Sequence, residues 1–128
     1  MELIKKQLTF FGSALNIRNR RNDIIASNIA NSATPNYKAR DINFLDEFKK
    51  VTNTGEIKTT HSNHIPTINY NISGKAFYRD PVIASLDGNT VELSVEQMQF
   101  AENTMKYQTT LKFLNGKITK MISAIRGE

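Results

Sequence analysis

Asn28-Ile29-Ala30-Asn31-Ser32-Ala33-Thr34-Pro35-Asn36-Tyr37-Lys38 closes a long amphipathic segment that begins at the first residue. Pro35 has no backbone N–H to donate and disfavours the helical conformation at Thr34, so a helix must end at or before this point. We expect Asn28 and Asn31 to bond backbone carbonyls that the helix end leaves free. We expect Asn36 to adopt the left-handed conformation that glycine adopts at lower cost. The stretch therefore predicts a helix within residues 1–34.

The N-terminal segment has the heptad spacing of a coiled-coil helix, with polar residues at the two middle positions of its seam. The seam consists of Ile4, Leu8, Phe11, Leu15, Arg18, Asn22, Ile25 and Ile29. A second apolar line flanks it and consists of Leu3, Phe10, Ala14, Ile17 and Ile24. This apolar face is wider than a two-stranded seam needs, which indicates contact with more than one neighbour.

The C-terminal segment keeps the same spacing without a break and predicts a helix from about residue 94 to 126. Its seam consists of Leu93, Gln97, Phe100, Thr104, Tyr107, Leu111, Leu114, Ile118, Met121 and Ile125. Ser94 with Gln97 predicts a capping box, and Asn89 with Glu92 is a competing one a turn earlier. Acidic residues, Glu96 among them, lie near the start and basic residues near the end, which complements the helix dipole. A helix of roughly 48 Å cannot fold around a small core of its own.

The middle segment has a different character, because all three prolines lie between residues 35 and 81. The apolar spacing of Phe44, Phe48 and Val51 predicts one short helix after Asp41. Residues 68–72 alternate as in a strand, and Ser73-Gly74 would turn this strand into a partner at residues 76–78. The segment could equally be an extended arm, or partly disordered when the protein is alone.

The Asn28–Lys38 stretch resembles the Ala-Asn-x-x-Thr-Pro-Gly-Tyr-Lys motif that ends the N-terminal helix of the axial proteins of the bacterial flagellum, with Asn36 in place of the glycine. The motif positions are Asn28, Asn31, Thr34, Pro35, Tyr37 and Lys38. Further matches follow in order at Asp41, Phe44, Thr60-His61, His64-Ile65, Asp87-Gly88-Asn89-Thr90-Val91-Glu92-Leu93, Ala101-Glu102-Asn103 and Tyr107-Gln108. Over nearly its whole length the chain is therefore similar to the proximal rod proteins, within the flagella basal body rod protein family.

This resemblance implies a mainly α fold in which the terminal helices form an antiparallel coiled-coil pair. The parts would be an N-terminal helix in 1–34, an extended middle segment with a β-hairpin in 35–90 and a C-terminal helix in 91–128. The helices would form the inner layer of an axial tube, and the middle segment its outer layer and arms. The expected assembly residues are Leu8, Phe11, Leu15, Ile25, Ile29, Phe100, Tyr107, Leu111, Leu114, Ile118, Met121 and Ile125.

The function that the resemblance implies is structural. The subunit would polymerise with other rod proteins, link the membrane ring and export apparatus to the distal rod, and transmit torque. Its partners would be those rod proteins, the basal-body adaptor between ring and rod, and further copies of itself. The first residues lack a signal-peptide layout, so we expect the flagellar type III apparatus to export the chain to a periplasmic rod. Phe11 and Leu15 resemble the short element that engages the export gate, although both also belong to the seam.

Other functions have weaker support in the sequence. The net charge of +5 and the cluster Arg18, Arg20 and Arg21 suggest a basic helical module for nucleic acid or anionic membrane, but no stacking aromatics are interleaved. A metal site at His61 and His64 would need a distant third ligand such as Asp80 or Asp87. There is no cysteine, no glycine-rich phosphate loop and no apolar run of about 20 residues. We expect no enzymatic activity, no cofactor, no binding to nucleic acid and no membrane-spanning segment.

Overall fold

The computed structural model describes residues 2–53, 75–81 and 85–127. In this part of the chain the structure has long helices at both ends and short elements between them. The elements are α1 (Glu2–Ala30), β1 (Arg40–Asp41), α2 (Phe44–Asn53), β2 (Phe77–Tyr78) and α3 (Leu93–Arg126). The sequence predicted both long helices and the short helix after Asp41, so the mainly α fold is confirmed.

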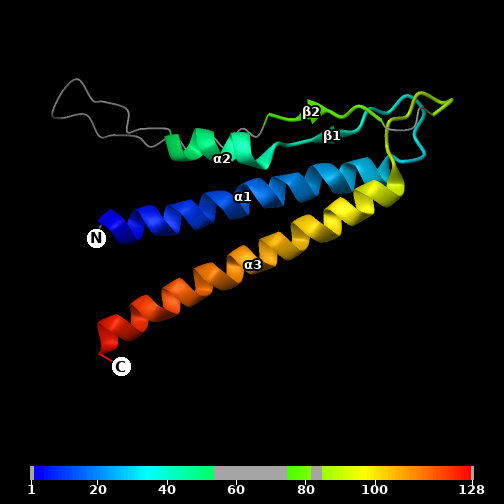
Figure 1. Cartoon of the computed structure of the whole chain (residues 1–128). Coiled ribbons are helices and arrows are strands. Elements are labelled where there is room, and N and C mark those ends of the chain that lie inside the picture. Colours follow the sequence, from blue (N-terminus) through cyan, green and yellow to red (C-terminus); the bar gives the residue numbers. More distant parts are fainter. Residues whose placement is uncertain (1, 54–74, 82–84, 128) are drawn as a thin grey trace, which may run out of the picture.

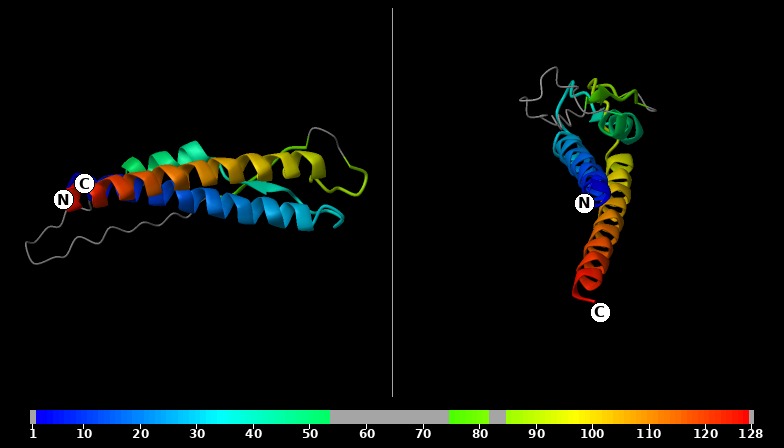
Figure 2. Two further views of the ribbon diagram at one scale, coloured as in Figure 1. Left: turned by 90° about the horizontal axis from the view of Figure 1, so that it is seen from below. Right: turned by 90° about the vertical axis from the view of Figure 1, so that its left-hand side faces the viewer.

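The two long helices form an antiparallel pair shaped like a V, and the chain termini lie at the same end (Figure 1). The helices approach each other most closely where α1 ends and α3 begins, which we call the closed end. They diverge toward Glu2 and Arg126, which we call the open end, and the end-on view in Figure 2 shows the same divergence. Helix α2 and strand β1 both pack on α1. The open end therefore leaves long helical surfaces with little cover from the rest of the described chain.

Helix α1 ends at Ala30, ahead of Pro35, as the proline requires. Asn36 has a φ of 60°, so its expected left-handed conformation is confirmed. The Asn31 side chain donates to the carbonyl of Ser27 at 2.8 Å, which also accepts the backbone N–H of Asn31. Asn28 behaves differently. Its amide donates to the carbonyl of Arg40 at 2.7 Å, outside the helix, because Asn28 is fully buried against the chain that follows the turn.

The start of α3 contradicts both predicted capping boxes. Glu92 occupies the N-cap position without a side-chain cap, so neither Ser94 nor Asn89 is the cap. The Asn89 amide donates instead to the carbonyls of Asn31, Ser32 and Thr34, at 3.1, 2.9 and 3.0 Å. These carbonyls follow the end of α1, and those of Asn31 and Thr34 also accept the backbone N–H groups of Thr34 and Tyr37. Asn89 thus stabilises the end of α1 from the start of α3.

The small sheet joins two segments that are distant in sequence. Strands β1 and β2 are antiparallel, with Arg40 opposite Tyr78 and Asp41 opposite Phe77. The sequence predicted a different partner for this second strand, residues 68–72, which lie outside the described residues. The observed pairing places Arg79 beside α1 and α3.

We predict that Asn89→Ala lowers the free energy of unfolding by about 2 kcal/mol, because the carbonyls of Asn31, Ser32 and Thr34 lose their bonds to a buried amide. Urea denaturation followed by circular dichroism measures this loss. Asn89→Asp is the matched control, because it keeps the side-chain shape and the oxygen that accepts from Val91, but removes the amide donor. If Asn89→Asp is as stable as the wild-type chain, the amide bonds do not stabilise α1.

Candidate functional site: a polar junction and two open apolar seams

Polar residues make up most of the fully buried part of the described chain. The buried apolar residues are Ala14, Ile17, Ile25, Ala39 and Ile42. The buried polar residues are Ser13, Asn28, Asp41, Glu47, Asn89, Glu96 and Asn103. Such groups are costly to bury unless they are hydrogen-bonded, so their partners fix how the elements meet.

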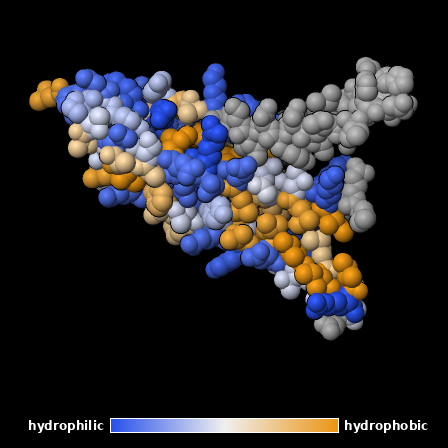
Figure 3. Space-filling view, turned by 180° about the vertical axis from the view of Figure 1, so that it is seen from behind, coloured by the Kyte–Doolittle hydropathy of each residue, from blue (hydrophilic) through white to orange (hydrophobic). Residues whose placement is uncertain are grey.

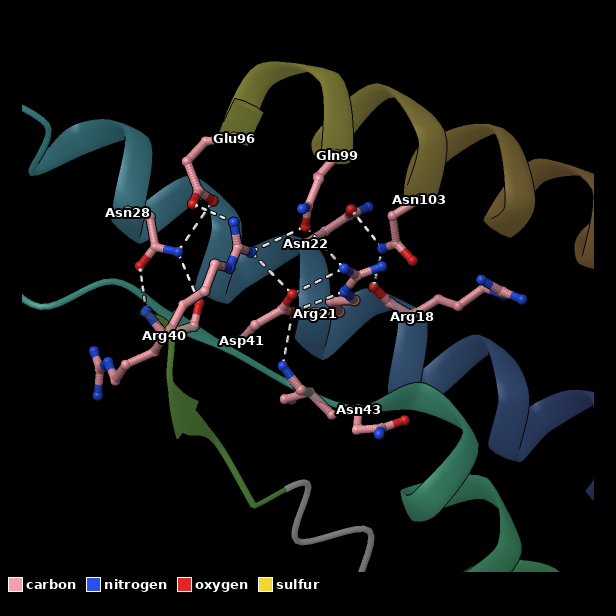
Figure 4. Close-up of polar contacts among 12 residues, drawn as sticks. Arg18, Arg21, Asn22, Asn28, Arg40, Asp41, Asn43, Glu96, Gln99 and Asn103 are labelled. Atoms are coloured by element: carbon pink, nitrogen blue, oxygen red, sulfur yellow. Dashed lines mark hydrogen bonds and ion pairs between the residues drawn. The ribbon is translucent and has the colours of Figure 1, made fainter. Parts of the chain in front are cut away.

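Asp41 lies at the centre of these contacts (Figure 4). Its carboxylate accepts two bonds from Arg21 of α1, Nε to Oδ1 at 2.8 Å and Nη2 to Oδ2 at 2.9 Å. Arg79, which follows β2, donates from Nη2 to Oδ2 at 2.9 Å. The paired guanidinium and carboxylate planes give charge-assisted bonds of defined direction. Asp41 therefore connects α1 to both strands of the sheet.

The same two arginines also bind α3. Arg79 donates to Glu96 Oε1 at 2.8 Å, and both arginines donate to Gln99 Oε1 at 2.9 Å. Asn28 donates to Glu96 Oε2 at 3.1 Å. We call this set the junction; its members are Arg21, Asn28, Asp41, Arg79, Glu96 and Gln99. The junction joins α1, the sheet and α3 near the closed end of the V.

The charges within the junction stabilise one another. Burial is the largest influence on Asp41 and acts to raise its pKa. The hydrogen bond and charge of Arg21, the backbone N–H of Ile42 and the charge of Arg79 together outweigh burial, so the pKa of Asp41 lies below its usual value. The hydrogen bond to Asp41 raises the pKa of Arg21 despite desolvation. Both groups are therefore charged at neutral pH, and each favours the charged form of the other.

A second polar contact lies further toward the open end, at the polar middle positions of the α1 seam. Asn103 of α3 donates to the carbonyl of Arg18 at 2.8 Å and to Asn22 Oδ1 at 2.7 Å. A single polar position in an apolar helical seam fixes the register, because any other alignment leaves it without partners. The contact with Asn103 therefore accounts for the two polar residues, Arg18 and Asn22, in the α1 seam.

Aromatic rings hold α2 against α1. Phe10 meets Phe48 edge to face at 4.8 Å, and Phe48 stacks on Phe44 at 5.4 Å. The guanidinium of Arg18 lies over the ring of Phe44, 4.2 Å from its centroid. Helix α2 thus contacts both the flanking apolar line of α1, through Phe10, and its seam, through Arg18.

The predicted assembly residues lie on surfaces that are only partly covered. On α1, Ile25 is fully buried; the others are half-buried or, like Leu8, more exposed. On α3, Tyr107, Leu114 and Met121 are half-buried, and Ile125 is 85% exposed. Phe100, Leu111 and Ile118 are each more than one third exposed. From residue 104 to 127 no residue is fully buried. The divergence of the helices leaves these surfaces open.

Apolar atoms also gather over α3 toward the open end in the space-filling view (Figure 3). Phe113 and Ile122, outside the predicted seam, are 63% and 44% exposed. Soluble monomers rarely expose a contiguous apolar surface of this extent unless a partner binds it. The open end therefore has the composition of an interface.

The motif residues hold the turn at the closed end against the Asp87–Leu93 stretch. Lys38 Nζ donates to the carbonyl of Gly88 at 2.7 Å, and the N–H of Asn36 donates to the carbonyl of Asp87 at 2.9 Å. Gly88 has a φ of 72°, and a Cβ there would lie 2.5 Å from Asn36 Oδ1. The two stretches are therefore two halves of one structural unit.

The remaining motif residues act within the turn. Tyr37 donates to Asn28 Oδ1 at 3.4 Å and lies 3.2 Å from the Ser27 hydroxyl, and Thr34 donates to Asn31 at 3.3 Å. Pro35 is exposed and acts through its backbone.

The alternative sites have less support. Arg21 of the basic cluster is bound inside the junction, whereas Arg20 is exposed. His61 and His64 lie outside the described residues, and no group of three or more His, Cys, Asp or Glu within the described ranges could hold a metal ion. None of the described helices is long and apolar enough to cross a membrane.

Two comparisons with known proteins identify the family of the chain. Residues 8–38 match the family model described as Flagella basal body rod protein. The chain is 50% identical over 124 residues to Flagellar basal body rod protein FlgB of Cereibacter sphaeroides, covering 97% of each chain. It is 41% identical to the FlgB of Salmonella typhimurium and 39% identical to that of Escherichia coli, again over nearly the whole of each chain.

The fold is that of a mainly helical protein whose two long terminal helices expose apolar residues. The chain belongs to the flagella basal body rod protein family, and its role is structural, in the rod of the flagellar basal body. The family implies assembly with other components of the basal body and implies no catalytic activity.

We predict that Asp41→Asn lowers the free energy of unfolding at neutral pH by about 3 kcal/mol, because half-buried Arg21 loses its carboxylate partner and Arg79 keeps only Glu96. The folded pKa of Asp41 is depressed. Its contribution is therefore present above the unfolded value of about 3.9 and is lost as the pH falls through the lower folded pKa. Thermal unfolding across this acidic window should show a shallower pH dependence for Asp41→Asn than for wild type. Parallel curves would contradict the assignment.

Proposed function

We propose that the chain is a subunit of the proximal rod. It polymerises with other rod proteins, links the membrane ring and export apparatus to the distal rod, and transmits torque. The observation that carries this proposal is the V-shaped helix pair, in which the junction fixes the closed end and apolar seams are exposed along the open end. The exposed residues require cover, and neighbouring helices of the same kind would provide it.

The proposed assembly surface consists of Leu8, Phe11, Leu15, Ile29, Phe100, Tyr107, Leu111, Leu114, Ile118, Met121 and Ile125. Ile25, also expected there, is fully buried within the subunit and is left out of this surface. Each subunit would insert its open end among the helices of its neighbours. Contacts between different surfaces of successive subunits do not close on themselves and generate helical filaments, which is the symmetry of a rod. The angle between α1 and α3 would determine how the helices of neighbouring subunits are arranged in such a filament.

Torque transmission requires that subunits resist twisting. In the junction, charge-assisted bonds connect α1, the sheet and α3, and each arginine bonds more than one acceptor. Rotating one element about another would break several of these bonds together. The junction thus makes the closed end stiff, while the seams join subunits.

The proposal includes partners and a location. The partners are other rod proteins, the adaptor between membrane ring and rod, and further copies of the chain; the location is the periplasmic rod. The flagellar type III apparatus would export the chain without a cleaved signal peptide. The alternative, a basic module for nucleic acid or anionic membrane, depends on three arginines, of which Arg21 already has an internal carboxylate partner.

We predict that Leu114→Asp abolishes rod assembly and motility, because a carboxylate in an apolar interface without a partner costs several kcal/mol. Complementation of a null strain, with the chain quantified in purified basal bodies, measures assembly. Asn115→Asp is the matched control, since it places the same charge on an exposed neighbouring position of α3. Equal assembly of the two variants would remove Leu114 from the interface.

The proposed export role of Phe11 and Leu15 can be separated from packing. Both side chains are half-buried, so they contact the folded chain only in part. We predict that Phe11→Ala with Leu15→Ala leaves the subunit in the cytoplasm at normal expression, because a hydrophobic element read during export is lost. Cell fractionation measures export, and basal-body purification measures incorporation. Normal export with failed incorporation would leave only the packing role.

A further inference from the structure

Arg18 differs from the other arginines around the junction. Arg21 and Arg79 both pair with carboxylates, whereas no ion pair reaches Arg18 from the described residues. Its Nε atom is buried and has no hydrogen-bond partner there. Figure 4 shows the Arg18 side chain extending away from Asp41 and its partners. A planar guanidinium carries a fixed fork of donors, so an unsatisfied one is a candidate for recognition.

We infer that Arg18 is a docking site for a carboxylate side chain on a neighbouring rod subunit, an inference that rests on the proposed function. The ring of Phe44 supports the guanidinium from one side, at 4.2 Å, which restricts its orientation before any partner arrives. Arg18 remains partly exposed, so an incoming acid can reach its guanidinium, although not the buried Nε atom. A guanidinium that is ordered in advance loses less entropy when it forms a bidentate pair.

The charges around Arg18 favour an acidic partner. Desolvation by burial, and next the positive charge of Arg21, lower the pKa of Arg18, and Glu102 opposes them. Junction residues Arg21 and Arg79 carry two positive charges against the two negative charges of Asp41 and Glu96. Arg18 therefore adds an excess positive charge that is partly desolvated. A carboxylate brought by a neighbour would balance this charge.

The acid of this chain that acts on Arg18 electrostatically is already engaged. Glu102 of α3 accepts a hydrogen bond from Lys106, one turn further along the same helix. The position also suits a contact between subunits, because the register contact of Asn103 lies on the backbone of Arg18, and the helices diverge beyond it.

A carboxylate fits this site better than a nucleic acid or a phosphate-rich surface. Phosphate backbones are bound by several cations that act together. Here Arg21 is bound to Asp41, which leaves one oriented guanidinium rather than a cluster. One guanidinium fork matches one carboxylate in geometry and charge.

The test compares Arg18→Met with Arg20→Met in the full chain. Both changes remove one charge from neighbouring positions of α1, but Arg20 is exposed and lies outside the junction. Methionine at position 18 keeps apolar packing on Phe44. We expect the melting temperature of Arg18→Met to equal or exceed that of the wild-type chain, because an unpaired, desolvated charge is gone. We expect its amount in purified basal bodies to fall roughly tenfold or more, with Arg20→Met near the wild-type level.

Each other outcome is decisive. A lowered melting temperature with a proportionate loss from basal bodies would show that Arg18 acts within the subunit and would overturn the inference. Incorporation at the wild-type level would also overturn it, as would suppressors of Arg18→Glu that map to Glu102. Suppressors that replace an acid by Lys or Arg on another rod subunit would support it. If the wild-type chain itself is absent from basal bodies, the proposed function fails instead.

Discussion

The carboxylate of Asp41 is the contact on which the arrangement of the other elements depends. It receives Arg21 from α1 and Arg79 from the end of the sheet, and the same arginines continue to Glu96 and Gln99 on α3. Without this acid, three elements that share few buried apolar residues would have no fixed geometry. A buried ion network adds little net stability, because desolvation offsets much of the Coulomb attraction, but its directed bonds specify one arrangement.

This division of roles explains why so much apolar surface remains exposed. The fully buried apolar residues of the described chain are few and lie around α1, whereas the apolar line of α3 is open from Tyr107 onward. If apolar packing held the subunit together, the apolar residues of the seams would be buried within it. Because polar bonds fix the closed end instead, the seams are available for neighbours. The hydrophobic effect is nondirectional and suits extended burial between subunits.

The sequence predicted the parts of the fold that depend on local pattern. Heptad spacing predicted both long helices, and Pro35 predicted where α1 ends. The spacing of Phe44, Phe48 and Val51 predicted α2. These signals can be read from the sequence because periodicity and proline sterics act within a few residues. The junction could not be predicted in this way. Arg79 and Asp41 are 38 residues apart, and neither has a pattern that identifies the other. Glu96 was read only as a charge favourable to the helix dipole.

Competition for hydrogen bonds explains the remaining differences. Asn89 has a residue type and position suited to an N-cap, yet its amide bonds carbonyls that follow the end of α1. Asn28 likewise bonds the chain beyond the turn rather than its own helix. In both cases a partner distant in sequence satisfies the group more completely than a local one. The same reasoning applies to the seams, where local pattern identifies an apolar line but not whether its partner belongs to the same chain. The V shape supplies that missing information, because helices that diverge cannot cover each other.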